Sequence, residues 1–164
     1  MKKIAVFALA AAFLGITASA SAARIAYVDV KKVFDAYTGT QSAKDALKRK
    51  VDDEKAKLET EKDALDKEAN DLQGKKSVLT ESKFKEDMEA LQVKGRALQD
   101  KFQAVTKELQ DEEAKQTSEI VDLIKEAVSK VAKREKYDLV FEGSTLLYGG
   151  DEITASVIEE VNAK

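Results

Sequence analysis

Apolar residues in the middle of this chain recur at intervals of seven. One series is strict and consists of Val51, Leu58, Leu65, Leu72 and Leu79. A second series alternates steps of four and three residues, and consists of Phe84, Met88, Leu91, Gly95, Leu98, Phe102, Val105 and Leu109. Both patterns are typical of helices that pack along a narrow seam against another helix.

The two series match one another if the chain turns back near Val78. A single register then forms five apolar pairs: Leu72 with Phe84, Leu65 with Leu91, Leu58 with Leu98, Val51 with Val105, and Leu47 with Leu109. The sequence therefore predicts a long antiparallel helical hairpin over residues 41–117, with its tip near residues 74–80. A helix over residues 41–73 would be about 50 Å long, far more than the radius of a small domain.

Helix signals frame the predicted hairpin. Gly74 can end the first helix, and Thr80 can cap the second. After Leu109 the seam positions hold Glu112 and Gln116, so we expect a polar break where the arm meets the rest of the chain. A wide apolar stripe from Ile120 to Val131 then predicts that the second helix enters a core.

The two ends of the chain have a different, β-rich pattern. Residues 25–30 are apolar on both pleat faces through most of their length, and residues 137–141 and 145–148 form two further β-rich runs. Gly143 and Ser144 read as a tight hairpin connection between the last two runs. We expect a short helix from Val33, a loosened turn near Gly39, and a terminal helix over residues 154–161. The fold class is predicted to be α+β, with a helical hairpin emerging from a small β body made by residues 23–40 and 118–164.

This body is small for the apolar surface that it contains. A three-stranded sheet with two apolar faces cannot bury both faces by itself, so self-association would supply the missing surface. The alternative is that the short helices cover both faces within one chain. We expect the oligomerisation body to use apolar residues of the three runs: Ile25, Tyr27, Val28, Leu139, Phe141 and Leu146.

The first residues form a separate unit. Lys2 and Lys3 precede an apolar run from Ile4 to Ile16, and small residues follow it. This pattern predicts a signal peptide over residues 1–22, cut after Ala22, and export to the periplasm. The apolar run is shorter than a membrane-spanning helix requires. Cleavage would remove two lysines and no acidic residue, which changes the formal net charge from −3 to −5.

Composition excludes most catalytic chemistry. The chain contains no cysteine, histidine, tryptophan or proline. Thiol nucleophiles, imidazole bases, Cys/His zinc sites and disulfides are therefore impossible. Carboxylates such as Asp52, Asp53 and Glu54 occupy a charged helix, where we expect solvated, salt-bridged surface rather than a catalytic pocket. We predict no enzyme, and no catalytic, cofactor-binding or metal-binding residue.

The residues at the two ends resemble those of the Skp/OmpH family of periplasmic chaperones. The resemblance is carried by the signal peptide, the proline-free hairpin and three segments: Ile-Ala-Tyr-Val-Asp-Val-Lys-Lys-Val-Phe (25–34), Tyr-Asp-Leu-Val-Phe (137–141) and Asp-Glu-Ile-Thr-Ala-Ser-Val-Ile (151–158). It implies a homotrimer whose nine strands form a central barrel, with three arms that enclose unfolded outer-membrane proteins without ATP. It implies no residue-level client motif.

The resemblance predicts an ATP-independent holdase that prevents aggregation during outer-membrane protein assembly. Candidate client contacts near the tip are Val78, Leu79, Phe84 and Met88, although Leu79 and Phe84 could instead close the hairpin end. The acidic charge argues against lipopolysaccharide or membrane-surface contact through basic side chains, and against nucleic-acid binding. The main alternative is a structural or tethering coiled coil of the cell envelope, without a visible lipid anchor. An efflux adaptor would need more β-rich flanking sequence.

Overall fold

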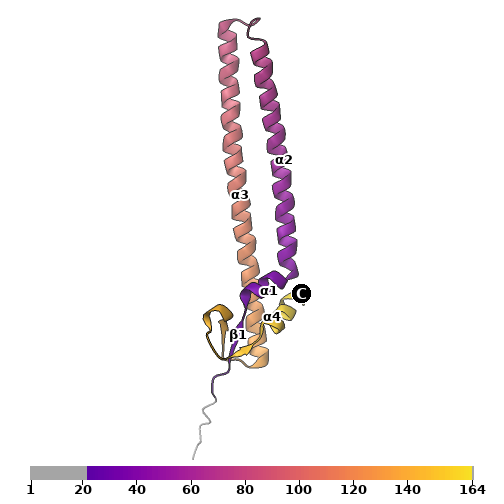
Figure 1. Ribbon diagram of the computed structural model, residues 1–164, viewed down its shortest axis with the longest axis vertical. Coiled ribbons are helices and arrows are strands. Elements are labelled where there is room, and N and C mark those ends of the chain that lie inside the picture. Colours follow the sequence, from indigo (N-terminus) through magenta and orange to yellow (C-terminus); the bar gives the residue numbers. More distant parts are fainter. Residues whose placement is uncertain (1–21, 164) are drawn as a thin grey trace, which may run out of the picture.

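A long two-helix arm projects from a small body in the computed structural model, which describes residues 22–163 (Figure 1). The predicted signal peptide lies outside the described residues, apart from Ala22. The elements in chain order are β1 (Ile25–Val28), α1 (Val30–Ala36), α2 (Thr38–Gly74), α3 (Glu81–Glu135), β2 (Leu139–Glu142), the 3₁₀ turn η1 (Gly143–Thr145), β3 (Asp151–Glu152) and α4 (Thr154–Asn162). The α+β class and the three-stranded sheet are as predicted.

Helices α2 and α3 form the antiparallel arm, with 37 and 55 residues respectively. Most seam residues of the arm are only half-buried, whereas Leu72 is buried. Four ion pairs join the two helices in the described residues: Lys50 with Glu108 and with Glu112, Lys94 with Glu68, and Lys101 with Glu61. The arm is thus held by a thin apolar seam together with surface charge pairs, which individually add little stability.

Two cross-arm contacts are displaced from the predicted register, by four residues at Gly95 and by six at Lys94. Under the predicted pairing Glu68 would stand opposite Met88, whereas its carboxylate meets Lys94 at 2.5 Å. A methyl group placed on Gly95 would be 3.9 Å from Leu65, whose predicted partner is Leu91. Helical side chains lean toward the N-terminus of their own helix. Side chains of α2 therefore lean toward the body and those of α3 toward the tip. This lean has the same direction as both displacements.

Thr80 begins α3 as predicted. Its hydroxyl accepts a hydrogen bond from the Lys83 N–H at 3.3 Å, which satisfies one of the free donors of the first turn. We expect Thr80→Ala to destabilise this turn by about 1 kcal/mol. Hydrogen exchange of the first-turn amides should accelerate about fivefold, while Ser77→Ala in the same loop should leave the rates near wild type. Equal exchange in both variants would contradict a capping role.

The sheet is entirely parallel, with strand order β2-β1-β3. Residues 25–28 of β1 pair in register with residues 139–142 of β2, and Ala26 and Tyr27 pair with Asp151 and Glu152 of β3. The predicted tight hairpin at Gly143 and Ser144 is therefore wrong, as is a third strand over residues 145–148. Parallel strands cannot be joined by a two-residue turn, and here the chain passes from one side of β1 to the other through η1 and residues 146–150.

The junction between the strand and the arm also differs from the prediction. β1 ends at Val28, two residues early, because Asp29 caps α1 by accepting the Lys32 N–H at 2.9 Å. The expected turn near Gly39 is a break at Tyr37, and α2 begins directly afterwards at Thr38 rather than at Gln41. The Tyr37 ring lies against Gly39, since a Cβ there would be 2.3 Å from the ring. Any larger residue at position 39 would displace this ring.

The core lies where α3 enters the body, as the wide stripe predicts. Ala26 and Val28 of β1 meet a cluster of buried residues from α1, α3 and α4: Val33, Ile120, Ile124, Ala127, Val131, Val157 and Val161. Between this core and the arm seam, Gln116 donates to Glu112 at 3.0 Å, and Lys50 is 3.8 Å from Glu112. The predicted polar break is therefore present, with Lys50 beside Glu112.

Candidate interaction surfaces

One face of the sheet is packed and the other is open. Ala26 and Val28 point into the core, whereas Ile25 and Tyr27 point to the opposite face. The β1–β2 register places Leu139 beside Ile25 and Phe141 beside Tyr27. Leu139 is 51% exposed and Phe141 is 42% exposed. We call these four residues, Ile25, Tyr27, Leu139 and Phe141, the open face.

Both edges of this small sheet are unpaired within the described chain. β1 is the central strand, so the outer sides of β2 and β3 have no strand partner among residues 22–163. Unpaired edges combined with an apolar face are features that sheets normally cover by a further strand or another chain. Within this chain, the short helices cover only the core face.

Five of the six predicted body residues divide between the two faces of the sheet, and Leu146 lies in the loop after η1. Four of them make up the open face, while Val28 is 3% exposed and belongs to the chain's own core. Leu146 is half-buried, and its side chain lies within 3.4 Å of a Cβ built on Gly150. The strict alternation of a strand could have separated Val28 from Ile25 and Tyr27 in advance.

Two exposed residues beside the sheet are not among the predicted body residues. Leu147 and Tyr148 are essentially fully exposed in the loop between η1 and β3. Gly149 and Gly150, with φ of 84° and 86°, adopt the left-handed conformation that glycine permits, and so shape this loop. The apolar character of Leu147 and Tyr148 predicts a strand over residues 145–148, and a strand in a packed sheet would not expose both side chains.

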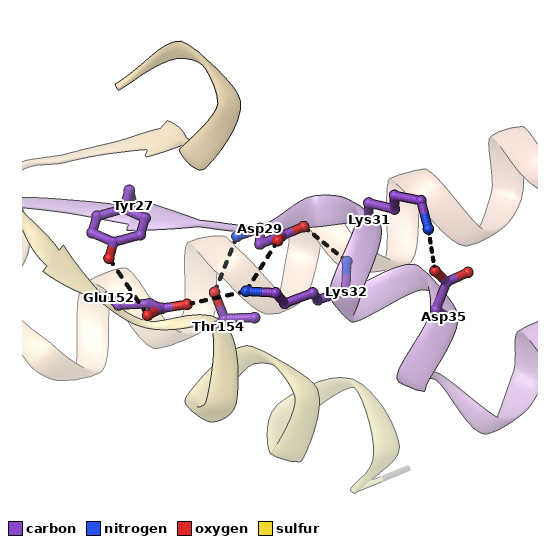
Figure 2. A network of polar contacts seen from close by, with 7 residues as sticks. All are labelled: Tyr27, Asp29, Lys31, Lys32, Asp35, Glu152 and Thr154. Atoms are coloured by element: carbon purple, nitrogen blue, oxygen red, sulfur yellow. Dashed lines mark hydrogen bonds and ion pairs between the residues drawn. The ribbon is translucent and has the colours of Figure 1, made fainter. Parts of the chain in front are cut away.

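A polar network ties the strand ends to the helices around them (Figure 2). The Asp29 N–H donates to the Thr154 hydroxyl at 3.0 Å, which joins the end of β1 to the start of α4. The Tyr27 hydroxyl and the Lys32 ammonium both approach the Glu152 carboxylate, at 3.4 and 4.0 Å. These contacts fix the short helices against the sheet, and they involve no residue of the open face other than Tyr27.

The opposite end of β1 is held by Arg24. Its guanidinium stacks over the Tyr137 ring at 4.5 Å, and it donates to the Glu135 carbonyl at 2.8 Å. The Tyr137 hydroxyl donates to Asp151 at 3.0 Å. Burial, followed by this hydrogen bond to a carboxylate, raises the pKa of Tyr137. The cluster joins the start of β1 to the end of α3 and to β3.

Acid should destabilise this body. The Lys32 N–H lowers the pKa of Asp29 below its ordinary 3.8, and the Arg134 hydrogen bond lowers the pKa of Glu160 below 4.5. Because each carboxyl has a lower pKa in the folded state, its contribution is present above the unfolded pKa and is lost as pH falls through the folded pKa. We expect the melting temperature to be level from about pH 6 to 8 and to fall below about pH 4.5.

The matched variant is Asp29→Asn, which keeps a capping oxygen but removes the titrating charge. Circular dichroism melts from pH 7 to pH 3 should show a smaller acid-induced decrease for this variant than for the wild type. Parallel curves for the two proteins would contradict the role assigned to Asp29.

The four predicted tip residues differ in exposure. Val78 is 79% exposed, whereas Leu79, Phe84 and Met88 are half-buried. The Leu79 N–H donates to the Lys75 carbonyl at 3.1 Å, and the Lys76 ammonium lies 5.7 Å from the centre of the Phe84 ring. Leu79 and Phe84 thus take part in closing the hairpin end. Val78 remains the most accessible apolar residue of the tip.

Neither a metal site nor a membrane-spanning helix is present among residues 22–163. No group of three or more Asp or Glu side chains there is arranged to hold a metal ion. No described helix has a stretch that is both long and apolar enough for a membrane crossing.

Taken together, these features define a class of protein: a small α+β body that carries a long antiparallel helical hairpin. A family model described as outer membrane protein (OmpH-like) matches residues 24–161, which include both the body and the arm. The chain therefore belongs to the OmpH-like family. No curated protein matches it.

A solved structure shares the fold. It comes from Caulobacter crescentus CB15 and is described as that of a candidate outer membrane chaperone (OmpH-like). The two proteins are 21% identical and superpose with a TM-score of 0.80, over 93% of this chain and 91% of the other. At this identity the likeness establishes the common fold, and the family match establishes the relationship.

Proposed function

We propose that this protein is a periplasmic, ATP-independent holdase that encloses unfolded outer-membrane proteins and prevents their aggregation. The observation that carries the proposal is the family match over residues 24–161, which spans the body and the whole arm. The description of the structural neighbour as a candidate outer membrane chaperone supports the same role. The exported protein would begin after Ala22.

The active form would be a homotrimer. Residues 23–40 and 118–164 would form the oligomerisation body, and residues 41–117 the arm. The open face and the two unpaired sheet edges support this proposal, because a second and third copy could cover both. Nine strands would then make a shared barrel, and the three arms would surround a common space.

The proposed mechanism requires no catalytic residue. Unfolded outer-membrane strands expose apolar surface that aggregates in water. Three arms can hold one chain through many weak contacts, so that affinity comes from their number rather than from any single site. The half-buried seam and the surface ion pairs suit arms that bend to fit clients of different sizes.

The tip contribution is tested by replacing Val78 and Met88 with Ser in the mature protein. Removing two partly exposed apolar side chains should weaken suppression of client aggregation about fivefold. Light scattering after dilution of a urea-unfolded outer-membrane protein measures this effect. The control is Val93→Ser, since Val93 is 65% exposed on the arm but far from the tip loop. Unchanged suppression in the double variant would remove the tip from the client surface.

A further inference from the structure

The two flanks of the arm differ in their chemistry. At about 100° per residue, the cross-arm ion-pair residues of each helix fall on one side of the apolar seam. On α2 these are Lys50, Glu61 and Glu68, and on α3 they are Lys94, Lys101 and Glu108; Glu112, which also pairs with Lys50, occupies a seam position. Ala64 and Ala97 lie on the same side. This flank is bridged by charge pairs between the helices.

The opposite flank opens into an apolar groove between α2 and α3. Its volume is about 430 Å³, within the range of ligand-binding clefts. The apolar side chains that line it are Val51, Leu58, Leu98, Phe102, Val105 and Leu109. The groove occupies the half of the arm nearer the body, well away from the tip.

The groove is open because two seam residues do not close it. Phe102 occupies a heptad seam position, yet it is 58% exposed, and Val51 is 39% exposed. In a tightly packed coiled coil such residues would insert between side chains of the facing helix. An aromatic ring left in water at a seam position is therefore available to a partner.

We propose that this groove binds an extended segment of an unfolded outer-membrane protein, with the apolar side chains of alternate residues inserted between α2 and α3. The inference rests on the proposed function and assigns a client site on the arm. Alternate residues of a strand lie about 6.7 Å apart on one face. Leu98 to Leu109 spans about 16 Å of helix, which accommodates about three such side chains.

Membrane β-strands have the matching pattern, since their side chains alternate between apolar and polar. The polar side chains of a bound strand would face the groove rim and water. The rim is locally neutralised: Lys55 lies 3.9 Å from Glu59, and Glu54 lies 2.6 Å from Lys57. A rim without excess charge suits a bound strand whose inserted side chains are apolar and whose outward side chains are polar and uncharged. It suits a charged helix less well.

A second arm fits the groove less well. A helical partner would need an apolar stripe along most of the arm, whereas the apolar lining of this groove ends at Leu58 on α2 and at Leu98 on α3. Toward the tip the helices meet through the ion-paired flank and through Leu72, which is buried. The short apolar length therefore favours an extended peptide over a long helix.

Site-directed crosslinking in the full mature chain tests the proposal. The chain contains no cysteine, so Thr106→Cys places a unique thiol at the groove, and Ala97→Cys places one on the ion-paired flank. Each thiol is labelled with a benzophenone and irradiated with a urea-unfolded eight-stranded outer-membrane protein. We expect client adducts to be about fivefold more abundant from position 106, and Phe102→Ser to reduce them by about fivefold, unlike Val93→Ser.

The outcomes separate the groove from the general function. Suppressed aggregation with equal adducts from both positions would overturn the groove while leaving the holdase intact. Adducts from position 106 that join two copies of this chain, instead of the client, would also overturn it. Failure of every variant and of the wild type to bind the client would overturn both the groove and the proposed function.

Discussion

Phe141→Asp is expected to convert the mature protein from an oligomer to monomers. Phe141 stands beside Tyr27 on the open face, outside the core of its own chain. In the proposed trimer the substitution would place three carboxylates at the shared barrel, and taking an unpaired charge out of water costs several kcal/mol for each ion. Size-exclusion chromatography with light scattering at micromolar concentrations should then report the mass of one chain.

Two controls separate assembly from folding. Phe141→Leu keeps an apolar side chain and should retain the wild-type mass. Val93→Asp adds the same charge to an exposed apolar position on the arm and should also leave the mass unchanged. The Phe141→Asp monomer should keep its helical circular dichroism, because the core residues around Ile124 and Val131 are untouched. A wild-type mass for Phe141→Asp would exclude the open face from the interface.

Shortening the arm is expected to abolish protection of large clients while leaving assembly intact. Deleting residues 59–72 and 82–95 removes two heptads from each helix, so the remaining seam positions keep their spacing. The deletion keeps Thr80, loop residues 74–80 and the apolar residues of the groove, and it removes Phe84 and Met88, so the Val78 and Met88 serine variant is measured beside it. The arm becomes about 21 Å shorter. A shorter arm encloses less space and offers fewer contacts, and affinity built from many contacts falls steeply when some are removed.

The measurement compares a large and a small unfolded outer-membrane protein in the same aggregation assay. The shortened protein should lose most of its protection of the large client and retain more of its protection of the small one. Its mass in solution should still correspond to the same number of chains as the wild type. Equal protection of both clients by the shortened and the full-length proteins would contradict enclosure by the arms.

The arm was predictable because its information is local and periodic. Seven-residue spacing specifies which side of each helix faces the other, so the antiparallel hairpin and its tip between Gly74 and Thr80 follow from the sequence. The exact register was less determined. A shift of about one turn keeps the same residues on the seam, and only contacts such as that of Lys94 with Glu68 define it.

The body was predictable in outline but not in topology. The β-rich ends indicate that three strands meet, but short strands carry no signal for parallel or antiparallel pairing. The run from Leu146 to Tyr148 resembles a strand in composition, yet parallel pairing of β2 and β3 with β1 requires it to be part of the connecting loop. The side of the sheet that remains open depends on how α1, α3 and α4 pack.

The candidate surfaces depend on geometry that the pattern alone does not give. Phe102 and Val51 have the sequence signature of seam residues, and heptads predict that they are covered. Their exposure arises because the helices are bridged on one flank and open on the other. Similarly, Leu79 and Phe84 help to close the hairpin end, so that Val78 is the prominent apolar residue of the tip.

Sedimentation of the mature protein, alone and with a urea-unfolded outer-membrane protein, tests the central proposal most directly. We expect the protein alone to sediment with the mass of three chains. In the presence of the client, the main species should have the mass of three chains plus one client, without added nucleotide. A single-chain mass, or three chains whose sedimentation is unaffected by the client, would contradict the proposal.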